Sequence, residues 1–192
     1  MNEDYRQVLD FWFGAPGTET HGRQRKEWFV KDAAFDAQIR ERFLDLHGRA
    51  QAGELKAWEA DPEGLLALIV VLDQFSRNLF RDTPRAFASD AQALACARKM
   101  VERGWDMDLA PVLRSFVYLP YEHTENLVTQ DEALRLFKRV LEDPSLAELP
   151  EWARKHREVI RRFGRFPHRN AILGRESTPE EEEFLRQPGS RF

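Results

Sequence analysis

The chain has 192 residues, enough for a single domain with a substantial core. Its apolar share of 42% and charged share of 32% are typical of a globular protein and not of a disordered one. A net charge of −4 gives no general attraction to nucleic acid, and a single cysteine excludes an internal disulfide and a cysteine-based zinc site. We therefore expect one domain over residues 1–192, with no specific nucleic-acid partner.

The start of the chain and its longest apolar run bear on localisation. The first four residues include Glu3 and Asp4 and lack the basic start and apolar run of a secretory signal. The run from Leu65 to Leu72 is far shorter than the roughly 20 residues that span a bilayer. We expect a cytoplasmic protein with no membrane partner and, since no phosphate loop or dinucleotide fingerprint occurs, no cofactor. The cysteine, Cys96, lies among small apolar residues and is expected to be buried.

Helical spacing of apolar residues dominates the first half of the chain. Asp4 is positioned to cap a first short helix that ends before Gly14. Asp32 is positioned to cap a second helix that ends near Gly53. Asp61-Pro62 begins a third helix that reaches about residue 80 and is apolar on all sides for two turns, which is typical of a central buried helix. The aromatic share of 11% indicates a core built on large rings.

The second half continues the same pattern of short helices and breaks. A fourth helix begins at residues 83–84 or at residue 89 and ends at residue 104. A fifth spans residues 108–119 and ends at Pro120. A sixth starts at residues 124–126 and ends before residue 143, and a seventh runs from Pro150 to Gly164. Thr178 and Glu181 form a capping-box pattern that begins a last helix, 178–187, followed by a flexible tail, 188–192. The sequence predicts an all-α fold of about seven to nine helices packed as helix hairpins.

The first polar cluster lies at the end of the buried third helix. Asp73 and Arg77 are four residues apart, as are Gln74 and Asn78, so each pair shares a helix face. Polar groups at a buried helix end must be hydrogen-bonded or paired. The cluster is therefore either a network that ties helices together or the polar floor of a pocket.

The second polar cluster surrounds the predicted break at Pro120. Glu122, His123 and Glu125 lie at a helix junction, where side chains can converge. A histidine beside a carboxylate suits acid–base chemistry, although a hydrogen-bonded histidine next to a helix cap is also compatible with the pattern. No second pair of ligands completes a zinc site, so we expect no metal.

The third polar cluster follows Gly164. Arg165, His168, Arg169 and Asn170 lie in a segment where glycine and proline indicate irregular backbone and two aromatic residues indicate packing against the core. Ordered loops rich in such residues are often functional, and arginine suits carboxylate or phosphate ligands. The surrounding basic residues precede an acidic run, residues 180–183, and the two blocks are expected to neutralise one another in part.

Together the three clusters resemble a bacterial family known as domain of unknown function 924. The matching stretches are Leu72 to Asn78 with Phe80-Arg81, Leu119 to Glu125, and Arg165 to Asn170. Asp61-Pro62 and Leu173-Gly174-Arg175 also fit. The resemblance implies a tetratricopeptide-like arrangement of helix hairpins, and it implies no particular activity.

Three hypotheses of function follow. The leading one is a binding module whose Arg/His/Asn-lined pocket takes a small anionic molecule or a peptide carboxylate. Its expected residues are Asp73, Gln74, Arg77, Asn78, Glu122, His123, Arg165, His168, Arg169 and Asn170. The second is an acid–base enzyme of hydrolase type, with His123 or His168 as base and Glu122 or Asp73 as its orienting group. The third is a tetratricopeptide-like interaction scaffold. The oligomeric state is left open.

Overall fold

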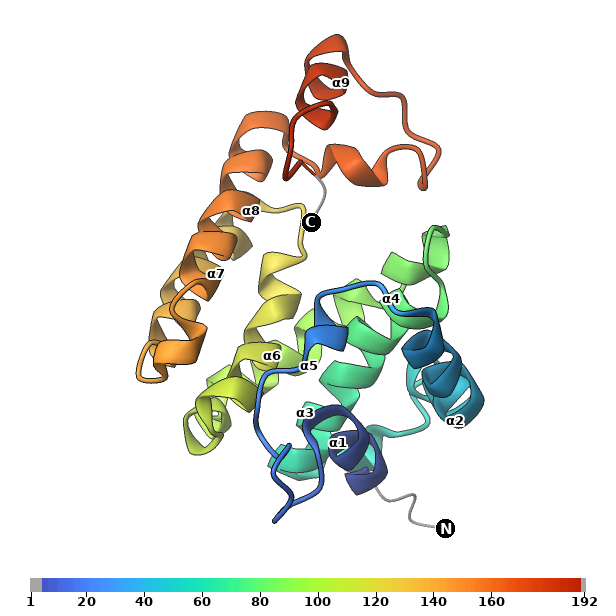
Figure 1. Ribbon diagram of the computed structural model, residues 1–192, viewed down its shortest axis with the longest axis vertical. Coiled ribbons are helices and arrows are strands. Elements are labelled where there is room, and N and C mark those ends of the chain that lie inside the picture. Colours follow the sequence, from blue (N-terminus) through green and yellow to red (C-terminus); the bar gives the residue numbers. More distant parts are fainter. Residues whose placement is uncertain (1–4, 191–192) are drawn as a thin grey trace.

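The computed structural model describes residues 5–190, and all regular structure within this range is helical (Figure 1). Short 3₁₀ turns join the longer helices, and the prediction of an all-α fold is confirmed. The α-helices are α1 (Arg6–Phe13), α2 (Ala33–Gln51), α3 (Pro62–Ile69), α4 (Ser76–Leu79), α5 (Asp90–Glu102), α6 (Pro111–Glu122), α7 (Leu127–Phe137), α8 (Leu149–Phe163) and α9 (Pro179–Leu185).

The predicted central helix is a continuous rod over residues 62–79. It consists of α3, a π-helical segment at Val70–Phe75, and α4. The Asp61 carboxylate caps the rod by accepting hydrogen bonds from the backbone N–H groups of Glu63 and Gly64. Residues 64–76 are all buried, as the apolar pattern indicates. Gly64 is required because a Cβ there would lie 2.5 Å from the Trp58 carbonyl oxygen.

The main core is built on aromatic rings around this rod, as expected from the composition. Phe11 stacks on Phe35 with ring centroids 5.2 Å apart, and Phe75 lies 4.9 Å from Phe43. Trp12 lies 5.6 Å from Phe75, so rings from α1, α2 and the rod form one continuous cluster. Packing of α3 against α5, and of α5 against α6, extends this core.

A second, smaller core lies at the C-terminal end of the molecule. It contains Val159, Ile160 and Phe166, against which Phe163 and Phe184 pack. Pairing of α6 with α7 and of α7 with α8 connects it to the main core, and α9 lies at the far end of the molecule (Figure 1). Polar side chains from both parts meet between the two cores.

Both predicted boundaries of the fifth helix were wrong. Helix α6 continues through Pro120 and ends at Glu122, with His123 as its C-cap residue. Proline inside a helix costs one backbone hydrogen bond and clashes with the carbonyl group four residues earlier. Here Pro120, Tyr121 and Glu122 are all buried, and their packing holds the last turn of the helix. The helix also begins at Pro111, not at residue 108, because Trp105–Asp108 forms a separate 3₁₀ turn.

The remaining expectations fall into three groups. Cys96 is buried, as predicted, and the capping box at Thr178 and Glu181 is present. The predicted cap at Asp4 lies outside the described residues, and so do the last two residues of the expected tail. Ser190, which belongs to the same tail, is buried. The tetratricopeptide-like arrangement stays a prediction. No helix within residues 5–190 has the length and apolar character needed to cross a membrane.

Candidate functional site

The π-helical segment presents Asp73, whose side chain is only 1% exposed. Its Oδ1 lies 2.7 Å from His123 Nδ1 and 3.2 Å from Arg77 Nη1, and its Oδ2 accepts a hydrogen bond of 2.6 Å from Gln74 Nε2. A π-helical turn inside an α-helix often marks a functional site. Three of the predicted side chains therefore converge on one buried carboxylate.

His123 reaches Asp73 because it is the residue at which α6 ends. Its side chain is 15% exposed. Burial and the positive charge of Arg77 lower the pKa of His123 below its ordinary value, and the Asp73 carboxylate offsets this only in part. Burial would raise the pKa of Asp73, but Arg77 and His123 lower it overall. At neutral pH the pair therefore consists of an ionised Asp73 and a neutral His123.

A chain of charges extends from Asp73 to Arg169. Arg77 donates to both carboxylate oxygens of Asp90, at 3.0 and 3.2 Å. Asp90, the first residue of α5, also accepts a longer hydrogen bond of 3.4 Å from Arg169 Nη1. We call the five residues Asp73, Arg77, Asp90, His123 and Arg169 the Asp73 cluster.

Arg169 occupies an unusual position for an arginine. Its guanidinium carbon lies 4.5 Å from the ring centroid of Phe87 and 4.6 Å from that of Phe166, and the residue is 7% exposed. Its Nε is buried and has no hydrogen-bond partner among residues 5–190. Burial, with the nearby charge of Arg77, lowers the pKa of Arg169 to about 10, so it is still charged at neutral pH.

A second histidine–carboxylate pair lies beside the first. Glu122 does not orient His123; its Oε1 lies 2.8 Å from Nδ1 of His156 on α8, and both residues are buried. Sequence reasoning placed His156 on the seventh helix and did not identify it as a site residue. The available signal was a histidine on the buried stripe of that helix, where a polar group needs a partner.

The other residues of the third motif form a separate network. Arg165 Nε and Nη2 donate to the two carboxylate oxygens of Glu181 at 2.7 and 2.8 Å. Asn170 bonds to Glu181 and Arg175, and Arg175 makes a bidentate pair with Glu125 at 2.7 and 2.9 Å. We call Glu125, Arg165, Asn170, Arg175 and Glu181 the Glu181 cluster. The expected mutual neutralisation of the basic and acidic blocks is therefore present.

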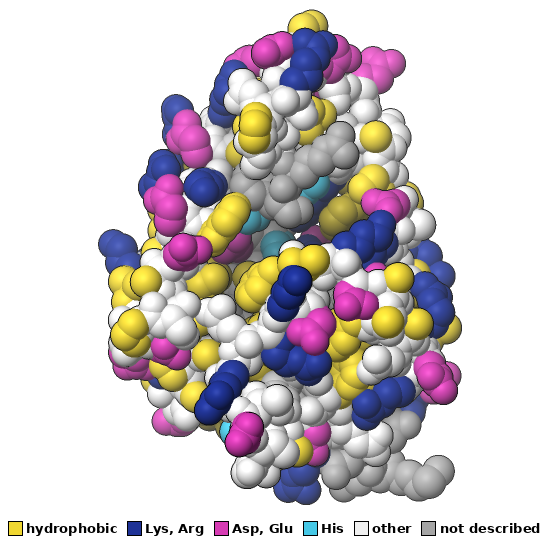
Figure 2. Space-filling model, in the orientation of Figure 1, with side chains coloured by type: hydrophobic (Ala, Val, Ile, Leu, Met, Phe, Trp, Pro, Cys, Tyr) yellow, Lys and Arg dark blue, Asp and Glu magenta, His cyan; other side chains and the backbone are white. Residues whose placement is uncertain are grey.

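The predicted residues thus divide between several places. Asp73, Gln74, Arg77, His123 and Arg169 come together, whereas Arg165 and Asn170 belong to the Glu181 cluster. Asn78 donates to Asp36 on α2 at 2.8 Å, away from both clusters. His168 is partly buried, with its ring 5.6 Å from that of Phe166. Histidine side chains are visible in a hollow between the C-terminal end and the rest of the molecule (Figure 2).

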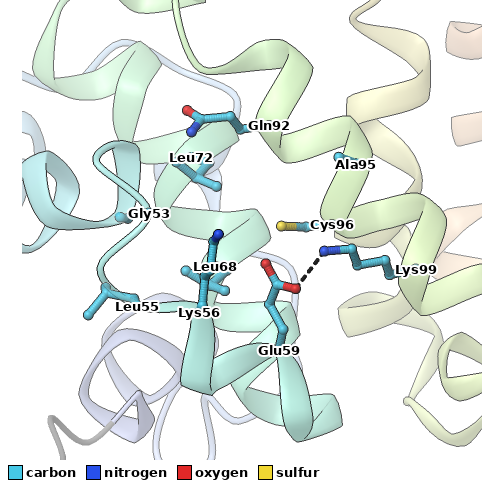
Figure 3. A pocket seen from close by; sticks show the side chains of 11 residues that line it. Gly53, Leu55, Lys56, Glu59, Leu68, Leu72, Gln92, Ala95, Cys96 and Lys99 are labelled. Atoms are coloured by element: carbon cyan, nitrogen blue, oxygen red, sulfur yellow. Dashed lines mark hydrogen bonds and ion pairs between the residues drawn. The ribbon is translucent and has the colours of Figure 1, made fainter.

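A small pocket lies elsewhere, between the rod, α2 and α5 (Figure 3). It has a volume of about 140 Å³ and none of the ten predicted site residues lines it. Its polar rim includes the ion pair between Lys99 and Glu59, with 2.5 Å between Nζ and Oε2. Burial raises the pKa of the Cys96 thiol in its wall to about 11, so this cysteine is mostly protonated and a weak nucleophile at neutral pH.

Comparisons with known proteins agree with the fold and the motifs. A solved structure of a protein of unknown function from Agrobacterium tumefaciens matches with a TM-score of 0.82 and 41% sequence identity, covering 95% of this chain and 96% of that one. No match was found among curated proteins. The model of a family described as bacterial proteins of unknown function (DUF924) matches residues 8–189. The chain therefore belongs to the bacterial DUF924 family.

Proposed function

We propose that the chain binds a small molecule carrying a carboxylate or phosphate group, and that Arg169 is the anchor. The observation that carries this proposal is the buried Nε donor of Arg169, which has no partner among residues 5–190. The guanidinium makes one hydrogen bond within that range, the 3.4 Å contact to Asp90. Asp90 is already engaged by two shorter bonds from Arg77.

An anion would supply what this arginine lacks. A buried donor without a partner costs about 1–3 kcal/mol, and more when the group is charged. A carboxylate or phosphate has two oxygens that match adjacent N–H groups of a guanidinium. The rings of Phe87 and Phe166 pack against the guanidinium, so an anion bound to it would interact in surroundings of low dielectric, where the attraction is stronger than in water.

The proposal reduces the set of expected binding residues, and it distinguishes a binding module from a purely structural scaffold. Arg165, Asn170 and Asn78 are engaged by internal partners, so we leave them out of the binding site. A purely structural network favours full pairing of its buried groups. The Glu181 cluster fits that description, and Arg169 does not.

A thermal-shift titration with simple anions tests the proposal. We use inorganic phosphate, acetate, succinate, citrate, and a tripeptide with a free or amidated carboxy terminus. A ligand at a hundred times its dissociation constant adds about 2.7 kcal/mol, which raises Tm by roughly 5–10 °C for a chain of this size. The two peptide forms distinguish a peptide carboxylate from a free acid.

The decisive comparison is between Arg169→Lys and Arg165→Lys. Lysine keeps the charge but lacks the Nε donor and the planar fork. We expect the anion-induced shift to disappear in Arg169→Lys and to persist in Arg165→Lys. No shift with any of these anions, or an unchanged shift in Arg169→Lys, would contradict the proposal.

A further inference from the structure

The two ring nitrogens of His123 have different roles. Nδ1 lies 2.7 Å from Asp73 Oδ1, and an ionised carboxylate can only accept hydrogen bonds, so Nδ1 carries the proton. Nε2 therefore carries a lone pair. Within residues 5–190 no hydrogen-bond donor engages Nε2. His123 thus has the tautomer and the free nitrogen of a general base.

The carboxylate that orients His123 is itself held on two sides. Gln74 donates to Oδ2 at 2.6 Å and Arg77 lies 3.2 Å from Oδ1. Arg77 also donates to the backbone carbonyl oxygen of Asp73 at 2.8 Å, and this bond holds the Arg77 side chain against the π-helical segment. A positioning carboxylate that is buried, ionised and immobilised keeps an imidazole in one tautomer and stabilises the imidazolium that forms during proton transfer.

The charged groups that face His123 come from two elements. Asp73 and Arg77 belong to the central rod, and Asp90 belongs to α5. Burial disfavours the protonated ring most strongly, Arg77 disfavours it further, and the two carboxylates favour it. At neutral pH His123 Nε2 is therefore unprotonated, while Nδ1 keeps its hydrogen bond to the Asp73 carboxylate.

The cluster links this base to the anion anchor. Asp73 contacts His123 at one end, Arg77 bridges Asp73 and Asp90, and Asp90 contacts Arg169 at the other end. Within residues 5–190 the His123 side chain forms no hydrogen bond with a serine, threonine or cysteine, so water is the simplest nucleophile for this base.

Resting on the proposed anion site, we infer that the Asp73 cluster hydrolyses an ester that carries a carboxylate, with His123 as the general base and Asp73 as its positioning residue. A water oxygen forms a bond to the acyl carbon while His123 Nε2 takes a proton from that water. The carbon–oxygen bond to the alcohol then breaks, and the Nε2 proton passes to the leaving oxygen. The products are an acid and an alcohol, and His123 is regenerated.

The test uses mono-4-nitrophenyl esters of succinic, glutaric and adipic acids, with 4-nitrophenyl acetate as the uncharged comparison. We expect faster enzymatic hydrolysis of the carboxylate-bearing esters. General-base catalysis contributes about 10²–10⁴-fold, so His123→Ala is expected to lower kcat by at least about 100-fold. Free imidazole should restore part of the lost activity, which a purely structural role of His123 does not predict. His21→Ala is the matched control, because His21 is exposed and bonds only to the Gly14 carbonyl oxygen.

Asp73→Asn separates positioning from packing. It should reduce kcat and move the low-pH limb of the kcat profile to lower pH, because Asp73 raises the pKa of His123. Arg169→Lys should instead raise KM for the charged esters. If hydrolysis of every ester is independent of His123, the inference is overturned. The thermal shift caused by anions is then measured for His123→Ala and for wild type. A shift that is retained in His123→Ala leaves the proposed anion binding intact although the hydrolysis is overturned. The absence of a shift in wild type contradicts both the anion binding and the hydrolysis.

Discussion

The Asp73 cluster and the Glu181 cluster each combine two carboxylates with two arginines but differ in how completely these groups are paired. In the Glu181 cluster, both oxygens of Glu125 and of Glu181 accept hydrogen bonds, and Arg175 donates from all three of its nitrogens. In the Asp73 cluster, Arg169 makes one long hydrogen bond within residues 5–190 and His123 Nε2 makes none there.

The difference separates a structural network from a candidate site. In the Glu181 cluster, full pairing of the buried Glu181 and of three partly exposed charged residues connects the segment after α8 to α9 and to the residues that follow α6. Incomplete pairing is unfavourable in the free protein, so it is a candidate for groups that a ligand completes. Residue composition alone gives no hint of this, because Arg165 and Arg169 lie four residues apart in one motif.

The largest stability effect is expected in the Glu181 cluster. Glu181→Ala removes the partner of Arg165 and also the acceptor for Asn170 and the Thr178 N–H, so the free energy of unfolding should fall by about 3 kcal/mol in urea denaturation. Glu183→Ala is the control, because Glu183 is exposed and pairs only with nearby Arg186; its effect should stay within about 0.5 kcal/mol.

The stability that Glu181 contributes should depend on pH. The Arg165 hydrogen bonds, against a smaller opposing effect of burial, lower the pKa of Glu181 from 4.5 to about 2. A depressed folded-state pKa means that this stabilisation is complete above pH 4.5 and is lost as the pH falls toward 2. The stability difference between wild type and Glu181→Gln should therefore narrow across that window. A constant difference from pH 7 to pH 2 would show that the ionised pair contributes little.

A smaller effect of opposite sign is expected at Arg169. Removing a buried donor that has no partner also removes the cost of its desolvation, and Asp90 keeps its two hydrogen bonds from Arg77 when Arg169 is replaced. Arg169→Met should therefore leave the free energy of unfolding unchanged or raise it by about 1 kcal/mol, while Arg165→Met lowers it. Equal destabilisation by the two substitutions in urea titrations would mean that Arg169 is as well paired as Arg165 and would remove the contrast between the clusters.

Much of the fold could be predicted because apolar periodicity and capping residues act locally. Asp32, Asp61 and Asn126 cap helices as their positions indicate. The π-helical segment was not predicted, because a helix that is apolar on all sides has no stripe whose register could reveal an extra residue. Pro120 led to a wrong helix end because tertiary packing can offset the cost of proline. The burial of Pro120, Tyr121 and Glu122, which provides that packing, is not visible in the local sequence.

The site could be predicted only in part. The four-residue spacing of Asp73 and Arg77 placed them on one face, and two residues named from the motifs, His123 and Arg169, contact Asp73 and Asp90. Their role in binding or catalysis stays a prediction. The partners that decide each role come from distant segments: Glu181 lies sixteen residues after Arg165, and Asp90 lies 79 residues before Arg169. No local pattern assigns one acid to one arginine, so the division into two clusters required the structure.

The most direct test of the central claim is NMR observation of the arginine Nε–H groups during titration with phosphate and with succinate. The Arg169 signal is assigned by its absence from Arg169→Lys, and the Arg165 signal likewise from Arg165→Lys. We predict that an anion shifts the Arg169 Nε–H signal in a saturable way while the Arg165 signal, already bonded to Glu181, stays in place. A stationary Arg169 signal at saturating anion would contradict the claim that its unpaired donor is the anchor of a binding site.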